Sequence, residues 1–475
     1  MNISLKKARL YSIATCLFTF TSLTAIADIQ KNVATTDTAL ASLDDRLHQF
    51  SAHFYPRLIR FDKYKKIGTI DSLVQTIDHY RSQNQPIQAT ASVINNLTIV
   101  EKFIDTTPII DISGLLLETN DWNTASQLYK KVKAQGDKSL VSNVSLSFAK
   151  YHFSRNQWKK TIDIVESIRS DLPPEDYHNA LLMHGISLQR LQKHRAALLQ
   201  YAKIPITSRY YAAARLNMAV ANIRQDWWTD AHIIINDLIN DRNHISNDAL
   251  TDRLYTVLGY SLLQQQYFRN SRDAFRNVSL DGPYTNKALL GIALSAAYQE
   301  DYIGALNAIR ILKDRKSHDL PVDEANLLMP YFYEKLQQQT TASAGYVAAI
   351  KYYESRASSI KSAMQIDSGF IRKQLTIGSS STVAINDEVV DLGEKLPEFI
   401  FANIRLLALF QPHVNRMGDV TLLREYNALN NEYDKVLQKV TQIILNEKSS
   451  YLTHYMNQSR YGLARIQDND ATIPQ

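Results

Sequence analysis

A three-residue pattern recurs along this chain and restricts its possible folds more than any other feature. Each copy holds a residue with a ring, a small residue three positions later and a bulky residue four positions beyond that. The small residues lie 36, 36, 34, 40, 34 and 44 positions apart. A period near 34 residues is typical of stacked helical hairpins, in which each hairpin buries its apolar face against the next. The seven copies are Trp122–Ala125–Tyr129, Trp158–Thr161–Val165, His194–Ala197–Tyr201, Trp228–Ala231–Ile235, Phe268–Ser271–Phe275, Tyr302–Ala305–Ile309 and Tyr346–Ala349–Tyr353.

A second series of small residues lies twelve positions before the small residue of each copy. We interpret this series as the first helix of each hairpin and the ring-containing pattern as the second, because small residues let paired helices approach closely. Pro173 and Pro283 follow at the opposite end, where a helix must stop. The last copy has Gln337 at the upstream position, so we predict an irregular unit or a junction there. The upstream residues are Ser113, Ala149, Gly185, Ala219, Gly259 and Ala293.

Two units show the pattern most clearly: His184-Gly185 with Ala197 and Tyr201, and Leu258-Gly259 with Ser271, Phe275 and Pro283. At these residues the chain resembles the tetratricopeptide repeat family, whose units carry Trp, Leu-Gly, Tyr, Ala, Phe and Pro over 34 residues. The resemblance implies an all-α fold, a right-handed α–α superhelix of about seven hairpins over residues 105–356. The layout is also similar to exported repeat proteins of Gram-negative bacteria, a likeness that implies no particular activity.

Residues 1–27 have the features of a cleaved signal peptide. Three basic residues precede a moderately apolar stretch, and Ala25-Ile26-Ala27 forms a small-x-small cleavage site. No later run approaches the ~18 apolar residues that a membrane span needs. We therefore expect an exported chain without a transmembrane segment, located in the periplasm. Secretion or association with the outer membrane is the alternative.

Removal of this signal changes the charge and the cysteine content. The whole chain has a formal net charge of +6, from 53 basic and 47 acidic residues, and loss of three basic residues leaves +3 (50 minus 47). A charge so close to balance does not indicate nucleic-acid binding. The single cysteine, Cys16, lies within the signal, so the mature chain cannot form a disulfide.

The segments that flank the repeats are also predicted to be mostly helical. Residues 28–104 form an N-terminal helical segment, residues 357–385 a linker or loop, residues 386–466 a helical hairpin or coiled coil, and residues 467–475 a disordered tail. The basic and aromatic stretch 53–66 is interpreted as a half-buried aromatic face, or alternatively as a patch for an anionic envelope surface.

An apolar seam with alternating steps of four and three runs through the C-terminal segment, as in a coiled coil. Two interpretations remain open: the seam caps the end of the solenoid, or residues 420–445 mediate self-association or docking of a partner. The seam residues are Leu422, Tyr426, Leu429, Tyr433, Val436, Val440 and Ile443.

The sequence contains no catalytic or metal-binding motif of the common classes. The twelve histidines are scattered, and we interpret His184 and His194 as packing residues. The close acidic pair Asp44 and Asp45 is of the kind usually found on a solvated face. We therefore expect no enzyme activity, no metal and no cofactor.

The family resemblance implies that the first helix of each hairpin lines a concave surface. Five of the 25 surface positions assigned in this way to five hairpins are basic, and none is acidic. This composition suits an extended peptide with acidic residues, whose carboxylates arginine can bind through forked hydrogen bonds. In the alternative, neighbouring units or the C-terminal helices cover these positions. The candidate ligand-binding residues are Lys150, Arg190, Arg224, Arg253, Tyr260, Lys287 and Tyr298.

These features together predict an exported, non-catalytic scaffold that binds protein partners of the cell envelope. The alternative is a protein that associates with glycans or other anionic polymers in polysaccharide or peptidoglycan processes.

Overall fold

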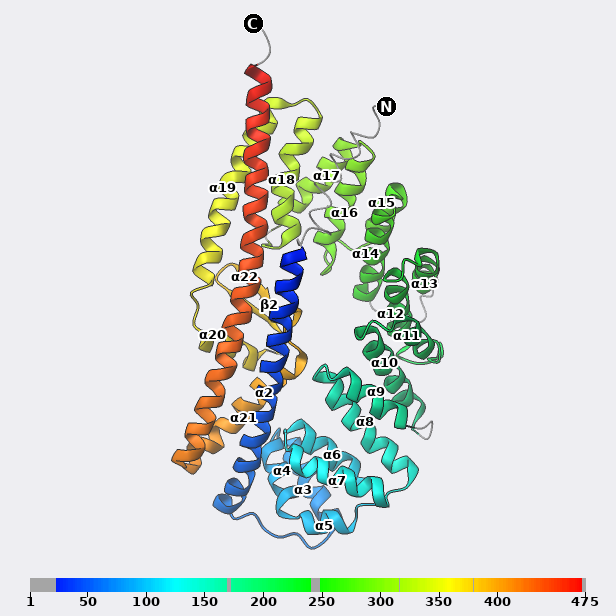
Figure 1. Cartoon of the computed structure of the whole chain (residues 1–475), viewed down its shortest axis with the longest axis vertical. Coiled ribbons are helices and arrows are strands. Elements are labelled where there is room, and N and C mark those ends of the chain that lie inside the picture. Colours follow the sequence, from blue (N-terminus) through cyan, green and yellow to red (C-terminus); the bar gives the residue numbers. More distant parts are fainter. Residues whose placement is uncertain (1–22, 169–171, 241–247, 316, 379, 472–475) are drawn as a thin grey trace.

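The computed structural model describes residues 23–168, 172–240, 248–315, 317–378 and 380–471, which form an arc of helical hairpins and a bundle of long helices (Figure 1). Residues 1–22, which hold most of the predicted signal peptide, and residues 472–475 lie outside the described part. Within the described residues, none of the helices combines the length and the apolar character that crossing a membrane requires.

Eight hairpins make up the arc in the described part of the chain. We call the first helix of each hairpin the A helix and the second the B helix. The pairs are α3 (Ile70–Ser82) with α4 (Pro86–Asn95), α6 (Pro108–Glu118) with α7 (Trp122–Gln135), α8 (Lys138–Ser154) with α9 (Trp158–Ser167), α10 (Pro174–Arg190) with α11 (His194–Tyr201), α12 (Tyr211–Ile223) with α13 (Trp228–Asn240), α14 (Asp248–Gln264) with α15 (Phe268–Arg276), α16 (Thr285–Tyr298) with α17 (Tyr302–Lys313), and α18 (Leu320–Lys335) with α19 (Gln339–Ala363). The short helix α5 (Leu97–Lys102) lies between the first two pairs.

Each A helix ends in the same tight turn. A residue with φ between 56° and 64°, in the left-handed region, lies two positions before each B helix. The N–H of the next residue donates to a carbonyl five positions back, as Asp121 does to Leu116 at 2.8 Å. This is the long hydrogen bond of a Schellman cap, which satisfies a carbonyl at the helix end. The left-handed residues are Asn84, Asn120, Asn156, Gln192, Asp226, Gln266, Glu300 and Gln337.

The ring residues of the sequence pattern begin the B helices in six units, from Trp122 of α7 to Tyr302 of α17. The seventh assignment is wrong, because Tyr346 lies two turns inside α19, which begins at Gln339. The equivalent triplet there is Gln339–Ala342–Tyr346, and its small residue lies 37 positions after Ala305. Ala349 and Tyr353 imitate the pattern because they are the next residues on the same buried helix face.

A further hairpin, α3–α4, precedes the predicted repeats. It carries Pro86 at the first position of its B helix, with Ala89 and Val93 buried at the small and bulky positions. This hairpin lies within the N-terminal helical segment 28–104 predicted from the sequence, and it lacks the repeat pattern because Pro86 has no aromatic ring. The arc therefore begins at Ile70 in the structure.

The pattern has a direct packing cause, which is clearest at Phe275 in α15. A Cβ atom added to Gly259, in the A helix of the same hairpin, would lie 2.6 Å from the Phe275 ring. A Cβ atom added to Gly291, in the next A helix, would lie 2.3 Å from the same ring. The ring therefore fills the space between two A helices that must approach closely, and the small residues on both sides are required by sterics.

Three long helices outside the hairpins form a second unit that we call the strut: α2 (Leu23–Asp62), α21 (Glu398–Met417) and α22 (Val420–Ala471). They share one apolar core, in which Phe54 of α2, Phe410 of α21 and Tyr433 of α22 are fully buried. At one end of the arc α2 packs against α4 and α7, and at the other end α22 packs against α18 and α19. The strut therefore joins the first hairpins to the last one, as Figure 1 shows.

The apolar seam of the C-terminal segment packs against other helices of the same chain. Leu422, Tyr426, Leu429 and Tyr433 are all buried in the core of the strut. These seam side chains pack against helices of the same chain and are not available for self-association, which stays a prediction for the other faces of residues 420–445. The second half of α22 caps the arc: a Cβ atom at Gly462 would lie 2.4 Å from the ring of Tyr346, as a Cβ at Gly291 does from Phe275. The helix thus takes the place of the next A helix.

The predicted linker 357–385 is mostly regular structure. It holds the end of α19, helix α20 (Ser368–Ile377) and strand β1 (Thr382–Ile385). Strand β1 pairs antiparallel with β2 (Glu388–Asp391), and a short 3₁₀ helix (Leu392–Glu394) follows. The helical hairpin expected over residues 386–466 therefore begins only at Glu398, with Pro397 as its N-cap. At the other end, α22 continues through Ala471 into the segment predicted to be a disordered tail.

Candidate functional site

The candidate binding surface lies on the A helices of five consecutive hairpins. In Figure 1 the A helices α12 and α14 lie toward the strut, whereas the B helices α13 and α15 lie on the outer side. One basic residue comes from each hairpin, and all five are exposed. None of the five forms an ion pair with another described residue, so each presents a free charge. We call this set the basic row: Lys150 of α8, Arg190 of α10, Arg224 after α12, Arg253 of α14 and Lys287 of α16.

The members of the basic row lie at different distances from the turns that end the A helices. Arg190 ends α10 and Arg224 directly follows α12, so both lie beside the turn that leads into the B helix. Arg253 and Lys287 instead lie near the beginning of α14 and α16. Lys150 lies in the second half of α8. The row therefore changes level between α12 and α14.

The two candidate tyrosines are packed between hairpins as well as facing the surface. The Tyr260 hydroxyl donates to the carbonyl of Lys287 at 2.8 Å, and its ring meets Phe275 edge-on at 4.8 Å between centroids. Burial, followed by the charge of Glu324, raises the pKa of Tyr260. Tyr298 stacks on Phe268 at 4.8 Å. Both rings are half-buried, so each offers only one part of its surface to a ligand.

One arginine of the row also lies close to a ring of the preceding B helix. The Arg190 guanidinium lies 6.0 Å from the ring centroid of Trp158. This contact orients the stem of Arg190, and the residue stays exposed. Burial, followed by the charge of Arg224, lowers the pKa of His194 at the start of α11.

The last A helix, α18, carries acidic residues on the side that faces α22. The carboxylate of Glu334 accepts hydrogen bonds from Arg465 of α22 at 2.7 Å and from the Tyr346 hydroxyl at 3.0 Å. Burial raises the pKa of Glu324 to about 8, and a hydrogen bond with Tyr455 of α22 opposes part of this shift. The chain's own α22 therefore covers the acidic end of the arc, whereas the basic row remains exposed.

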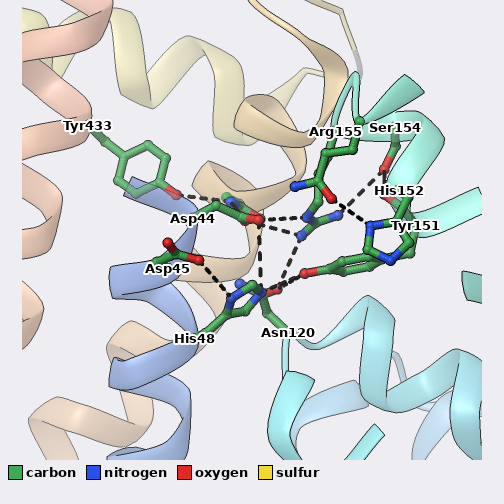
Figure 2. A network of polar contacts seen from close by, with 11 residues as sticks. Asp44, Asp45, His48, Asn120, Tyr151, His152, Ser154, Arg155 and Tyr433 are labelled. Carbon is green, nitrogen blue, oxygen red and sulfur yellow. Dashed lines mark hydrogen bonds and ion pairs between the residues drawn. The ribbon is translucent and has the colours of Figure 1, made fainter. Parts of the chain in front are cut away.

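A buried polar cluster, which we call the node, fastens the strut to α8 near the start of the basic row (Figure 2). Arg155, directly after α8, donates from Nε to Asp44 Oδ2 at 2.8 Å and from Nη2 to Asn120 Oδ1 at 3.1 Å. Asn403 of α21 donates to Asp44 Oδ1 at 3.0 Å and to the Tyr433 hydroxyl at 2.9 Å. One carboxylate thus connects α2, α21 and α22 with two hairpins.

Aromatic rings complete the node. The Arg155 guanidinium lies 3.5 Å from the ring centroid of Tyr151, whose hydroxyl is hydrogen-bonded to His48 Nε2 at 2.5 Å. Burial is the largest cause of a lowered pKa at His48, and it lowers the pKa of neighbouring His152 to about 4. Both imidazoles are therefore neutral at pH 7, and the node holds one ion pair surrounded by neutral hydrogen-bonding groups.

Asp44 was expected on a solvated face, and that interpretation is wrong, because its residue is only 4% exposed. Asp45, its neighbour, does have an exposed side chain. The sequence did contain a signal for this difference. Asp44 lies four positions after Leu40 and three before Leu47, so the helical period of the apolar stripe passes through it.

A second buried ionic cluster fixes β2 to the last hairpin. Arg356 of α19 pairs with Asp323 of α18 at 3.2 Å and also with Glu388 of β2. Lys448 of α22 lies 3.5 Å from the same glutamate, and burial lowers the pKa of this lysine. The two positive and two negative groups of the cluster balance, as buried charges require.

The arrangement supports binding and structural roles. Within the described residues, no group of three or more His, Cys, Asp or Glu side chains has the geometry to hold a metal ion. The titratable groups of both buried clusters are engaged with each other. The basic row, in contrast, offers several separate charges on a broad surface, which is suited to a long, charged ligand.

No family model matches this chain, and no curated protein matches it. Among solved structures, the apo form of RapI is 13% identical in sequence, with a TM-score of 0.44, over 74% of this chain and 98% of its own. A tetratricopeptide repeat protein from Parabacteroides merdae is 13% identical, with a TM-score of 0.35, over 54% and 96%. The apo quorum sensor NprR from B. thuringiensis is 11% identical, with a TM-score of 0.35, over 70% and 99%.

Proposed function

We propose that this protein is an exported, non-catalytic scaffold that binds partner proteins through the A helices of its arc, and that the bound segment of the partner is acidic. The observation that carries this proposal is the basic row, five exposed and unpaired charges on five consecutive A helices. Each exposed charge contributes little by itself, but several charges that meet one ligand add up.

Helical repeat arrays support this role by their architecture. Each hairpin contacts only its neighbours, so the A helices present a long surface that no single domain of the same mass would offer. Arginine supplies planar, forked donors that match a carboxylate, and the half-buried tyrosines supply contact area beside them. Export rests on residues 1–27, and we place the working protein in the periplasm on that basis.

Crosslinking in the native envelope, followed by identification of the captured protein, tests the proposal. The triple variant Arg190→Ala, Arg224→Ala and Arg253→Ala should weaken binding of that partner about tenfold or more and flatten its dependence on salt. A matched control removes the same charge from exposed positions outside the A helices, at Lys159, Lys193 and Arg269. Equal affinity in both variants would refute the role of the basic row. Capture of anionic glycan in place of protein would favour the polymer-binding alternative.

Fractionation tests the location. The full chain should be recovered with periplasmic markers, and a chain that lacks residues 1–27 should stay in the cytoplasm. Recovery of both forms in the cytoplasm would refute export.

A further inference from the structure

Four of the five members of the basic row form two pairs that differ in level, and Lys150, which lies six positions before the left-handed Asn156, belongs to neither pair. Arg190 and Arg224 each lie two positions before the left-handed residue that ends their A helix. Arg253 and Lys287 each lie thirteen positions before the equivalent residue. Within each pair the positions are therefore equivalent, and the supporting helices contact each other, α10 with α12 and α14 with α16.

The spacing within and between the pairs follows from helix geometry. Packed helices lie about 10 Å apart, so the two charges of one pair have about this separation. The eleven-residue difference in level amounts to about 16 Å along a helix axis, at a rise of about 1.5 Å per residue. Helices α12 and α14 are joined through α13, which packs against both. A step of about 10 Å from α12 to α14, combined with the difference in level, gives a separation of about 19 Å between Arg224 and Arg253.

An extended peptide advances about 3.3 Å per residue. A separation of about 10 Å then corresponds to three residues, and about 19 Å corresponds to six. Building on the proposed function, we infer that the partner segment is an extended chain with two acidic pairs, at positions i, i+3, i+9 and i+12. The first pair meets Arg190 and Arg224, and the second meets Arg253 and Lys287.

The step in the row favours an extended ligand over a helical one. The path runs across α10 and α12 at one level, then shifts along the helices and runs across α14 and α16 at the other level. An extended chain can turn at the shift, whereas a helix is a straight rod. The hydrogen bond from Tyr260 to the Lys287 carbonyl fixes the relative position of α14 and α16, so the second pair is held in register.

Synthetic peptides of equal length, each with four Glu residues, test the spacing against the full chain. The first carries four Glu residues at i, i+3, i+9 and i+12 in a Ser- and Thr-rich background. The second carries the same residues in one block, and the third places the four Glu residues on one helical face in an Ala-rich background. Fluorescence anisotropy at low salt should give an affinity for the first peptide about tenfold above the other two.

Charge exchange assigns each acidic pair to its partner. Replacing the first two Glu residues by Lys should abolish the advantage of the first peptide, and Arg190→Glu with Arg224→Glu should restore it. Arg253→Glu with Lys287→Glu should restore the higher affinity only for a peptide in which the second pair of Glu residues is replaced by Lys. Lys159→Glu with Arg269→Glu is the matched control and should restore neither.

Other outcomes separate this inference from the proposed function. The first and second peptides could bind with equal affinity and both lose this affinity in the Arg190, Arg224 and Arg253 triple variant. That result would overturn the spacing and leave the proposed scaffold role standing. Preference for the helical peptide would overturn the extended conformation. If no peptide binds, the spacing is refuted, and the crosslinking experiment alone decides whether the basic row binds a partner.

Discussion

Replacing Asp44 by Ala should destabilise the protein by about 3–5 kcal/mol, the range for removing one partner of a buried ion pair. Asp44 accepts hydrogen bonds from Arg155 Nε at 2.8 Å, from Arg155 Nη2 at 3.3 Å and from Asn403 at 3.0 Å. The side chains of the pair are 8% and 6% exposed, so water cannot replace the lost carboxylate. Arg155 would keep only uncharged partners, namely the side-chain amide oxygen of Asn120, the hydroxyl of Ser154 and the rings of Tyr151 and Phe399.

A double-mutant cycle separates the pair from the packing around it. Asp44→Ala with Arg155→Met removes both charges and leaves no buried charge unpaired, so it should cost clearly less than the sum of the single variants. Asp45→Ala is the matched control, because its side chain is 78% exposed, and it should change stability by no more than about 0.5 kcal/mol.

Urea titration followed by tryptophan fluorescence measures these differences. Trp122 reports on the node, since its ring stacks on Tyr151 at 5.1 Å between centroids and on His48 at 5.9 Å. A loss below about 1 kcal/mol for Asp44→Ala, or a double variant that costs the full sum, would refute the reasoning, because either result would mean that Arg155 is solvated in the variant.

Two further predictions concern the hairpins and the cap. Burial raises the pKa of Glu324 to about 8 from an ordinary value of 4.5, so the folded carboxyl keeps a proton that the unfolded one releases. The free energy of unfolding should therefore fall by up to a few kcal/mol as the pH rises from about 4.5 to about 8. The variant Glu324→Gln should remove this fall. If the free energies of unfolding of wild type and variant differ by the same amount at both ends of the pH range, the raised pKa is contradicted. Gly291→Ala should destabilise the protein by about 1–3 kcal/mol, because the new methyl group overpacks on Phe275. Gly114→Ala has no atom within 4 Å of the new Cβ and should stabilise its helix by up to about 1 kcal/mol. Thermal denaturation in which the midpoints of both variants shift in the same direction would contradict the packing scheme.

The repeats were predictable because they are local. A ring beside small residues in two helices requires fixed spacings along the chain, and Tyr201 with Gly185 or Phe275 with Gly259 show that requirement in the sequence. The error at the last unit has the same origin. Ala342 and Ala349 lie on one buried face of α19, so the pattern fits in two registers and only the position of the turn at Gln337 decides between them.

The node could not be predicted, because its members are distant in sequence. Asp44 meets Arg155 across 111 positions and Asn403 across 359. The period of α2 indicated that Asp44 faces inward, but no local rule names the partner of a buried charge. The β1–β2 hairpin was missed for a different reason: each strand has only four residues, too few to show alternation against the helical pattern around it.

The identity of the basic row was available from the sequence, whereas its arrangement was not. The surface positions implied by the family resemblance include Arg190, Arg224, Arg253 and Lys287. Their grouping into two levels depends on where each A helix begins and ends, and the left-handed turns define those ends only in three dimensions.

The strut has a consequence for how this architecture can change. An open solenoid tolerates gain or loss of a unit, because each hairpin contacts only its neighbours and the free end simply moves. Here α2 packs against the first hairpins and α22 packs against the last one. The number of hairpins must therefore match the length of the strut, whose helix α22 has 52 residues. Deleting one hairpin would shorten the arc but leave the length of the strut unchanged, so the two attachments would no longer match. The number of hairpins, eight in the described residues, is therefore set by the distance between these attachments.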